Sequence, residues 1–326
     1  MYRALVFSGV VLTFLVIVAG AYVRLEDAGL GCPDWPGCYG QLLGVPDEVH
    51  EVATAEQAYP GSPVDPVRAW KEMFHRYLAG ALGLLILAIA VIAWRSRSEI
   101  GRPPGLATAL VAVVAFQATL GMWTVTLLLK PAIVALHLLG GMTTLALMTW
   151  LALREIDPPP APAAARTLRP WAALGLAVLA TQIALGGWVS ANYAALACPD
   201  FPACHGHWLP DMDLGHAFQV LRELGVTAAG APLSQDALVA IHWTHRVGAL
   251  VTVLYLGALA VKGLRVPALA VYSGLLLVLL LAQAALGIAN VLARLPLGIA
   301  VAHNGGAALL LAALVMLNFA VFKRSG

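Results

Sequence analysis

The sequence predicts an all-α integral membrane protein with eight transmembrane helices, arranged as two parallel pseudo-symmetric four-helix bundles. Composition is the first observation behind this prediction. Of 326 residues, 60% are hydrophobic and only 11% are charged, and the mean hydropathy is +0.83, which excludes an ordinary soluble domain. The second observation is a series of apolar runs long enough to cross a hydrocarbon core of about 30 Å. These runs cover about 4–23, 68–94, 105–127, 131–153, 170–192, 237–260, 267–290 and 297–322.

An internal repeat is the third observation. Cys32 and Cys198 differ by 166 positions (198 − 32), and a constant offset shared by several landmarks indicates internal duplication. Four spans in each half is an even number, so both halves enter the membrane in the same direction, as parallel repeats do. The other pairs at this offset are Gln117 with Gln283 and His137 with His303.

We expect three segments along the chain. Residues 1–153 form the N-terminal four-helix half and residues 170–326 form the C-terminal half. Residues 154–169 are a linker rich in proline and alanine, and its Pro158-Pro159-Pro160 cannot continue a helix. Ala19-Gly20-Ala21 resembles a signal-peptidase site, but the apolar run before it is long for a signal peptide and its loss would spoil the repeat. We therefore expect this run to remain as the first span.

The basic residues indicate the orientation. They gather in the short loops and tails on one side, which the positive-inside rule assigns to the cytoplasm. Both termini and the linker are then expected inside the cell, and the long loops at about 24–67 and 193–236 face outward. The basic residues on the inner side are Arg3, Arg95, Arg97, Arg102, Arg154, Arg166, Arg169, Lys262, Arg265, Lys323 and Arg324.

The outer loops contain all four cysteines. An oxidising outer compartment favours disulfides within Cys32/Cys38 and Cys198/Cys204, although the spacing alone also fits unpaired thiols. In the second outer loop, residues 214–224 carry apolar side chains at helical spacing. This pattern predicts an amphipathic helix that lies across the bundle mouth or covers its own half.

Histidines recur in the four even-numbered spans, each about two turns from the outer end. A lone transmembrane histidine is most often a hydrogen-bonding contact between helices, whereas two equivalent pairs at matched depth indicate ligands. Two facing imidazoles between apolar helices suit haem iron with two axial nitrogens. Zinc would require three or four ligands, and the second half lacks carboxylate and thiolate partners. The expected iron ligands are His75, His137, His245 and His303.

Further polar side chains lie close to these histidines. Arg76 and Arg246 directly follow two of them, and their guanidinium groups could pair with haem propionates or extend to the outer interface. Gln117, Gln182 and Gln283 each precede a small residue in an odd-numbered span. We expect these glutamines to mark close helix packing first and haem contact second.

Glu72 distinguishes the first half from the second. It lies three residues before His75, on the same helical face, and His242 takes its place in the second half. A carboxyl group buried beside a haem could relay a proton, or it could simply pair with Lys71, Arg76 or a neighbouring helix. The exchange predicts a catalytic first half and an electron-carrying or structural second half.

Taken together, these motifs resemble heme A synthase. This family oxidises the C8 methyl group of heme O to the formyl group of heme A for cytochrome oxidase assembly. The residues that carry the resemblance extend over nearly the whole chain. They are Arg24-Leu25, Gly29-Leu30, Cys32-Pro33-Asp34-Trp35-Pro36 with Cys38, Glu72 with His75-Arg76, Gln117 with Leu120-Gly121, His137, Asn192, Cys198-Pro199-Asp200-Phe201-Pro202 with Cys204, His242 with His245-Arg246, Gln283 with Leu286-Gly287, and His303.

The resemblance implies a role for each site. His75 and His137 would hold the substrate haem, as heme O and then heme A, while a resident haem b on His245 and His303 passes electrons. Glu72 would be the essential acid, and Cys32–Cys38 a disulfide, with Cys198–Cys204 matching the same pattern. The implied reaction is a pair of successive hydroxylations. Two histidine ligands would leave the substrate iron no open position for oxygen.

The resemblance also implies a bacterial-type inner membrane, with the haem sites toward the outer face. The expected partners are heme O, the lipid bilayer, an unidentified electron donor and heme O synthase, with a homo-oligomer left open and no nucleic acid. One alternative is a haem-b electron-transfer subunit, which would share the four histidines, have no use for Glu72 and carry two equivalent haems. Another is a haem transporter or chaperone.

Overall fold

The eight expected spans are confirmed as helices. The computed structural model describes residues 1–97, 103–159 and 162–323, and within these ranges it contains helices but no β-strand. Eight of the helices are long and apolar enough to cross a membrane. They are α1 (Tyr2–Leu25), α3 (Pro66–Arg95), α5 (Gly105–Thr126), α6 (Pro131–Ile156), α8 (Arg169–Ala191), α10 (Gln235–Leu264), α11 (Ala270–Leu292) and α12 (Leu297–Phe322).

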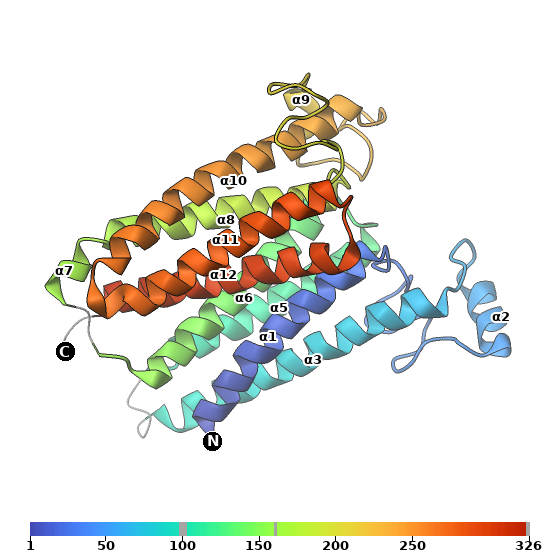
Figure 1. The fold of residues 1–326 in the computed structure, drawn as a ribbon. Helices are drawn as coiled ribbons and strands as arrows, with labels where there is room; N and C mark the ends of the chain where they lie inside the picture. The colour runs from blue at the N-terminus through green and yellow to red at the C-terminus, as the bar shows by residue number, and fades with distance from the viewer. Residues whose placement is uncertain (98–102, 160–161, 324–326) are drawn as a thin grey trace.

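Short helices lie in the connections between the spans. α2 (Val49–Ala58) and α9 (Leu214–Ala217) belong to the two long loops, and both lie at the end of the molecule opposite the start of α1 (Figure 1). α7 (Ala163–Arg166) and the 3₁₀ turn η1 (Pro267–Leu269) lie at the other end. Arg102 and Arg324, two of the basic residues expected on the cytoplasmic side, and Pro160 of the linker lie outside the described residues.

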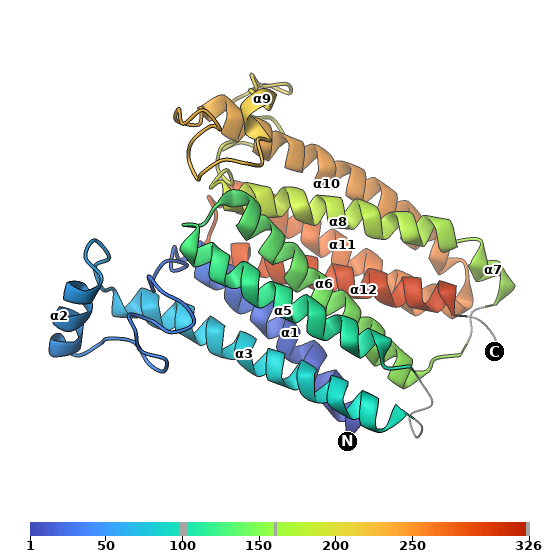
Figure 2. The same ribbon diagram turned by 180° about the vertical axis from the view of Figure 1, so that it is seen from behind.

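The spans pack as two sets of four. In the first half α1 contacts α3, α3 contacts α5, α5 contacts α6, and α6 returns to α1; α8, α10, α11 and α12 close a second ring in the same way. The two rings meet through α1, α6, α8 and α12, as Figures 1 and 2 show from opposite sides. α12 is the most enclosed span, with 67% of its most apolar window buried against 39% or less elsewhere. This arrangement is consistent with two parallel four-helix bundles.

Side-chain caps set where α3 and α10 begin. The Asp65 side chain accepts hydrogen bonds from the backbone N–H groups of Val67 and Arg68, and Pro66 occupies the first turn of α3. Ser234 caps α10 by accepting from the Ala237 N–H. These two caps fix the starts of the helices that carry Glu72 and its counterpart His242.

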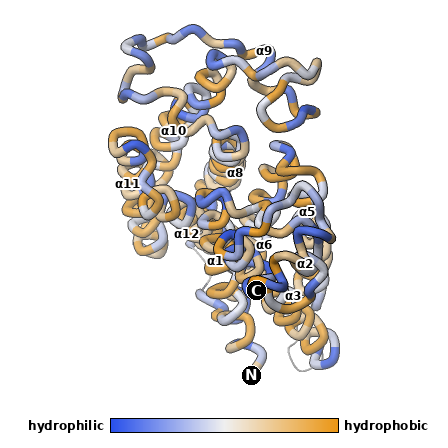
Figure 3. The backbone as a smooth tube through the Cα atoms, turned by 90° about the vertical axis from the view of Figure 1, so that its right-hand side faces the viewer, coloured by the Kyte–Doolittle hydropathy of each residue, from blue (hydrophilic) through white to orange (hydrophobic). Residues whose placement is uncertain are grey.

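The surface of the spans is apolar. Hydrophobic residues dominate the long helices in Figure 3, while hydrophilic stretches gather around α9 and its loop. Leu84 on α3 and Leu254 on α10 are 71% and 65% exposed. In a membrane such side chains contact lipid, and helices satisfy their own backbone hydrogen bonds there.

The helix predicted over residues 214–224 is wrong. α9 ends at Ala217, and turns follow it. Arg222 is buried, and its guanidinium group donates to the Asn192 side chain and to the Val226 carbonyl. Leu221, which an amphipathic helix would bury, is 86% exposed. A buried arginine that needs carbonyl partners therefore overrides the local apolar spacing.

Candidate functional site

Each of the four predicted ligand histidines packs against a glycine of the preceding span. The imidazole lies so close to the glycine backbone that a Cβ added there would meet the Cε1 atom of the ring. A larger residue would therefore displace the ring. The added Cβ would lie 2.9 Å from Cε1 for Gly20 with His75, 3.4 Å for Gly121 with His137, 3.1 Å for Gly186 with His245, and 3.1 Å for Gly287 with His303.

Sequence reasoning did not single out these glycines as partners of the histidines. A usable signal was present, because Gln117, Gln182 and Gln283 each stand four residues before one of them. Residues four apart share a helical face, so the spacing already placed glutamine and glycine toward the same neighbour. Gly20 has no glutamine four residues before it, since that position is Val16.

The histidines form two pairs, one in each half. His75 and His137 lie close enough to interact electrostatically, and so do His245 and His303. All four are only partly buried. The Nδ1 atoms of His75, His137 and His303 are buried without a hydrogen-bond partner. Each half therefore brings together two imidazoles from its second and fourth spans. These spans are α3 and α6 in the first half, and α10 and α12 in the second.

The three glutamines fix three of the histidine-bearing helices to their neighbours. The Nε2 group of Gln117 donates to the His137 carbonyl at 2.8 Å. Gln283 donates to the His303 carbonyl at 2.9 Å, and Gln182 to the His245 carbonyl at 3.1 Å. These bonds agree with the helix-packing role expected for the glutamines.

Glu72 lies beneath the first disulfide loop. Its Oε2 atom accepts a hydrogen bond from the Cys32 N–H at 3.0 Å, and its Oε1 atom pairs with Arg76 Nη2 at 2.5 Å. Glu72 is 4% exposed. Arg76 also donates to the carbonyls of Asp34, at 2.9 Å, and Gly37. The carboxylate thus joins α3 to the outer loop through one neutral donor and one cation.

His242 occupies the equivalent place in the second half. The Cys198 N–H lies 3.2 Å from its Nδ1 atom, and Arg246 Nε lies 3.2 Å from its Nε2 atom. Arg246 also donates to the Ala203 and Cys198 carbonyls, both at 2.8 Å. A neutral imidazole accepts at only one nitrogen, so His242 can satisfy only one of the two donors that face it. Glu72 accepts from both of its donors.

Both outer loops are closed by disulfides. Cys32 is bonded to Cys38 and Cys198 to Cys204. In each loop an aspartate accepts two backbone N–H bonds, at 2.7 Å from Tyr39 and Gly40 to Asp34, and at 2.7 and 2.8 Å from His205 and Gly206 to Asp200. The Gly206 bond contributes most to a pKa of Asp200 below its usual range. The loops therefore hold a fixed shape over Glu72 and His242.

The side chains present fit a haem with two axial ligands. Each histidine pair supplies two nitrogens, and the glycines let each ring pack directly on the preceding span. The unpartnered Nδ1 atoms of His75, His137 and His303 leave the protonation of these rings free to suit a metal. Among the described residues no group of three or more His, Cys, Asp or Glu side chains is placed to hold a metal ion directly. That ligand supply suits iron already held in a porphyrin better than a free cation.

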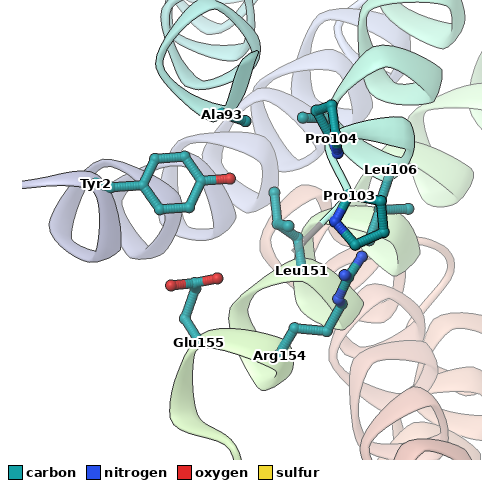
Figure 4. Close-up of a pocket in the computed structure, with 9 residues that line it drawn as sticks. Tyr2, Ala93, Pro103, Pro104, Leu106, Leu151, Arg154 and Glu155 are labelled. Atoms are coloured by element: carbon teal, nitrogen blue, oxygen red, sulfur yellow. The ribbon is translucent and has the colours of Figure 1, made fainter. Parts of the chain in front are cut away.

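Two cavities lie away from the histidine pairs. One, at the end where α1 begins, is lined by Tyr2, Arg154 and Glu155 among others (Figure 4), and its volume of about 10 Å³ has room for roughly one water. The other, of about 530 Å³, opens beside the first outer loop and is lined by residues that include Gly31 and Arg68. Since Gly31 precedes Cys32, this cavity adjoins the loop that Glu72 binds.

Comparison with known proteins agrees with this geometry. Residues 3–315 match the COX15-CtaA family model, described as cytochrome oxidase assembly protein. A heme A synthase of Shewanella oneidensis is 44% identical over 317 residues, which cover 97% of this chain and 95% of that protein. A heme A synthase of Halalkalibacterium halodurans is 30% identical over 76% of this chain and 78% of its own length. The resemblance found in the sequence motifs is thus confirmed, and the chain belongs to the COX15-CtaA family of cytochrome oxidase assembly proteins.

Proposed function

We propose that this protein is a membrane oxidoreductase that converts heme O to heme A. The reaction is oxidation of the C8 methyl group to a formyl group by successive hydroxylations. One observation carries the proposal. Two histidine pairs are built alike, yet the buried position beside them holds a carboxylate, Glu72, in one half and an imidazole, His242, in the other. Relatives named heme A synthase over nearly the full chain support it.

The two halves take different haems in this proposal. Residues 1–153 hold the substrate and product haem on His75 and His137, and residues 170–326 hold a resident haem b on His245 and His303. Residues 154–169 link the halves on the cytoplasmic side. The haem iron supplies the redox chemistry when bound. The membrane is a bacterial-type inner membrane, with both termini inside and the haem sites toward the outer face.

The side chains of the first half position the substrate and manage protons. Glu72 is held between the Cys32 N–H and the Arg76 guanidinium group, where it can take up or release a proton at a carboxylate oxygen. Arg76 and Arg246 supply positive charge to which haem propionates can turn. The disulfide loops cover both places and limit access of water. An unidentified electron donor and heme O synthase are the partners expected, and a homo-oligomer is compatible with the exposed apolar surface.

A specific observation favours a second candidate, a haem-b electron-transfer subunit. Glu72 and His242 both receive a cysteine N–H and both contact an arginine of their own helix. Two sites of such similar build could hold two equivalent haems. The presence of a carboxylate in only one half favours the synthase.

Haem extraction from the purified protein decides between the two. The protein is co-expressed with a heme O synthase, and its haems are extracted and identified by chromatography and mass spectrometry. The synthase predicts haem B together with heme A or its hydroxylated precursor. Recovery of haem B alone, with heme O supplied and unconverted, would contradict the proposal and favour the electron-transfer subunit.

A further inference from the structure

Three of the four ligand helices carry a feature that we call the glutamine–glycine lock. These helices are α6, α10 and α12. In each, a glutamine of the preceding span (α5, α8 or α11) donates to the carbonyl of the histidine. The glutamine side chain also fills the space beside a glycine three residues after that histidine. A Cβ at any of the three glycines would collide with the glutamine. The locks are Gln117 with Gly140, Gln182 with Gly248, and Gln283 with Gly306.

The lock fixes the helix register by a directional bond. A helix that slid or rotated would break the Nε2–carbonyl hydrogen bond, which is partly buried in all three helices. It would also drive the glutamine amide into the helix backbone, because the glycine leaves room at only one place. In α10 and α12 the glutamine also reaches the histidine ring, since Gln182 Nε2 lies 3.1 Å from His245 Nδ1 and Gln283 Nε2 lies 3.5 Å from His303 Nε2.

The first pair of spans, α1 and α3, has neither the glutamine nor the glycine of the lock. The position equivalent to Gln182 is Val16 (182 − 166). Beyond the outer loops the offset rises to 170, as between His75 and His245, because the second outer loop is longer. The position equivalent to Gly248 is therefore Leu78 (248 − 170). Val16 packs against an apolar cluster that includes Leu82 and Ile86 of α3. Among the described residues no side chain of α1 hydrogen-bonds to the His75 carbonyl. Lys71 of α3 pairs with Glu26 at the outer end of α1, but at the level of Val16 the contact is apolar. Apolar packing is not directional, so there α3 can shift against α1 at lower cost than the three locked helices can shift against their neighbours.

We propose that His75 is the releasable iron ligand of the first half, because α3 lacks the glutamine–glycine lock that holds the three other ligand helices. His137 is then the fixed ligand of the same haem, and both ligands of the second half are fixed. This inference rests on the proposed function and deepens it. A substrate haem must enter and leave, and a site in which one ligand detaches also frees an iron position that two bound histidines would block.

Carbon monoxide binding to the reduced protein tests the proposal. Carbon monoxide needs an open position on ferrous iron, so it reports ligand release without enzyme turnover. We expect it to bind the first-site haem and to leave the second-site haem unchanged. In Val16→Gln/Leu78→Gly, which installs the lock, the rate at the first site should fall at least fivefold at unchanged haem content. Leu78→Gly alone is the matched control, and it should not lower the rate.

A reverse variant in the second half tests the same inference without altering the first half. Gln182→Val/Gly248→Leu removes the lock from α10 and should make the second-site haem reactive toward carbon monoxide. An unchanged rate in Val16→Gln/Leu78→Gly, or a second-site haem that stays unreactive in a reverse variant with full haem content, would overturn the inference.

Failure of the proposed function gives a different result. A protein that contains haem B alone would contradict the proposed synthase function. Hydrogen–deuterium exchange of the backbone would still test the glutamine–glycine lock in that case. Amides of α3 around residues 75–82 should exchange at least fivefold faster than those of α10 around 245–252. Equal exchange in the two helices would contradict the lock without bearing on the substrate.

Discussion

Glu72 and His242 differ in charge but share a location. Both lie at the same turn of their helix, under a cysteine N–H and against an arginine four residues on. Either side chain could anchor its helix to the outer loop. Glu72 does this while accepting from both of the donors that face it. What only the carboxylate adds is a negative charge, on a group that can also carry a proton, so charge is the property to test.

Glu72→Gln should retain bound haem but slow oxidation of heme O roughly 100-fold, the scale of a lost general acid or base. Glutamine keeps an oxygen that can accept from the Cys32 N–H and removes the charge. The measurement is the ratio of heme A to heme O extracted from the membrane, at equal haem per protein. His242→Gln is the matched control and should leave that ratio unchanged.

Two outcomes of this comparison speak against an acid role. Full activity in Glu72→Gln would show that the charge is not needed. Loss of the first-site haem in the same variant would indicate that Glu72 acts by holding the outer loop in place. Glu72→Asp, which keeps the charge and shortens the reach, separates these cases because only a proton-transfer role allows partial rescue.

The sequence located these residues but could not assign their contacts. His75, Glu72 and Arg76 stand out because ionisable groups are costly inside an apolar span. Outside their own helix, Glu72 and Arg76 bond to backbone groups of a loop about forty residues away, such as the Cys32 N–H and the Gly37 carbonyl. Any residue offers such groups, so no side-chain pattern marks them. The contact of Arg76 and Arg246 with haem propionates stays a prediction.

At the scale of helices, the pairing of an odd-numbered span with the next even-numbered one is the repeating unit. In each pair a glycine lies against the histidine ring, so the helices approach closely at the depth of the proposed iron ligands. The unit occurs four times, from α1 with α3 to α11 with α12. Its integrity should therefore decide which haem is retained.

Gly186→Val should remove the second-site haem, and Gly20→Val the first-site haem. A Cβ at either glycine already crowds Cε1, of His245 at 3.1 Å and of His75 at 2.9 Å, and valine adds two methyl groups. Each variant should lose about one of two haems per protein, measured by the pyridine haemochrome spectrum. The control is Gly80→Val in α3, where an added Cβ meets nothing within 4 Å. Loss of both haems in either variant would mean that the sites do not fold independently.

The helices themselves were predictable, and the short loop helix was not. Apolar runs of membrane-spanning length admit one structure in a bilayer, so the eight spans match their predicted ranges. Residues 214–224 lie outside that constraint. There, one buried contact between Arg222 and Asn192 outweighs apolar spacing, and sequence alone does not reveal which loop arginine turns inward.

Across the whole molecule, the halves are joined by packing as well as by the linker. Arg24 of the first half donates to the Ser190 carbonyl of the second at 2.7 Å, and Lys130 pairs with Glu223 at 2.7 Å. The buried surface between the halves centres on α12, which contacts both α1 and α6. Such an interface should hold without a continuous chain.

A chain cut within residues 154–169 should reassemble when its two halves are co-expressed. Both haems should be present, and a tag on one half should recover the other.

Trp150→Ala tests the interface in this split protein, because the Trp150 ring of α6 packs edge-on against Phe319 of α12, with 5.0 Å between the ring centroids. Loss of a large partly buried aromatic contact costs roughly 1–3 kcal/mol, so recovery should fall about tenfold. Trp171→Ala is the control, since Trp171 packs on Tyr255 within the second half. Equal recovery for both variants would mean that other contacts between the halves stabilise their association, such as those of Arg24 and Lys130 at the outer end.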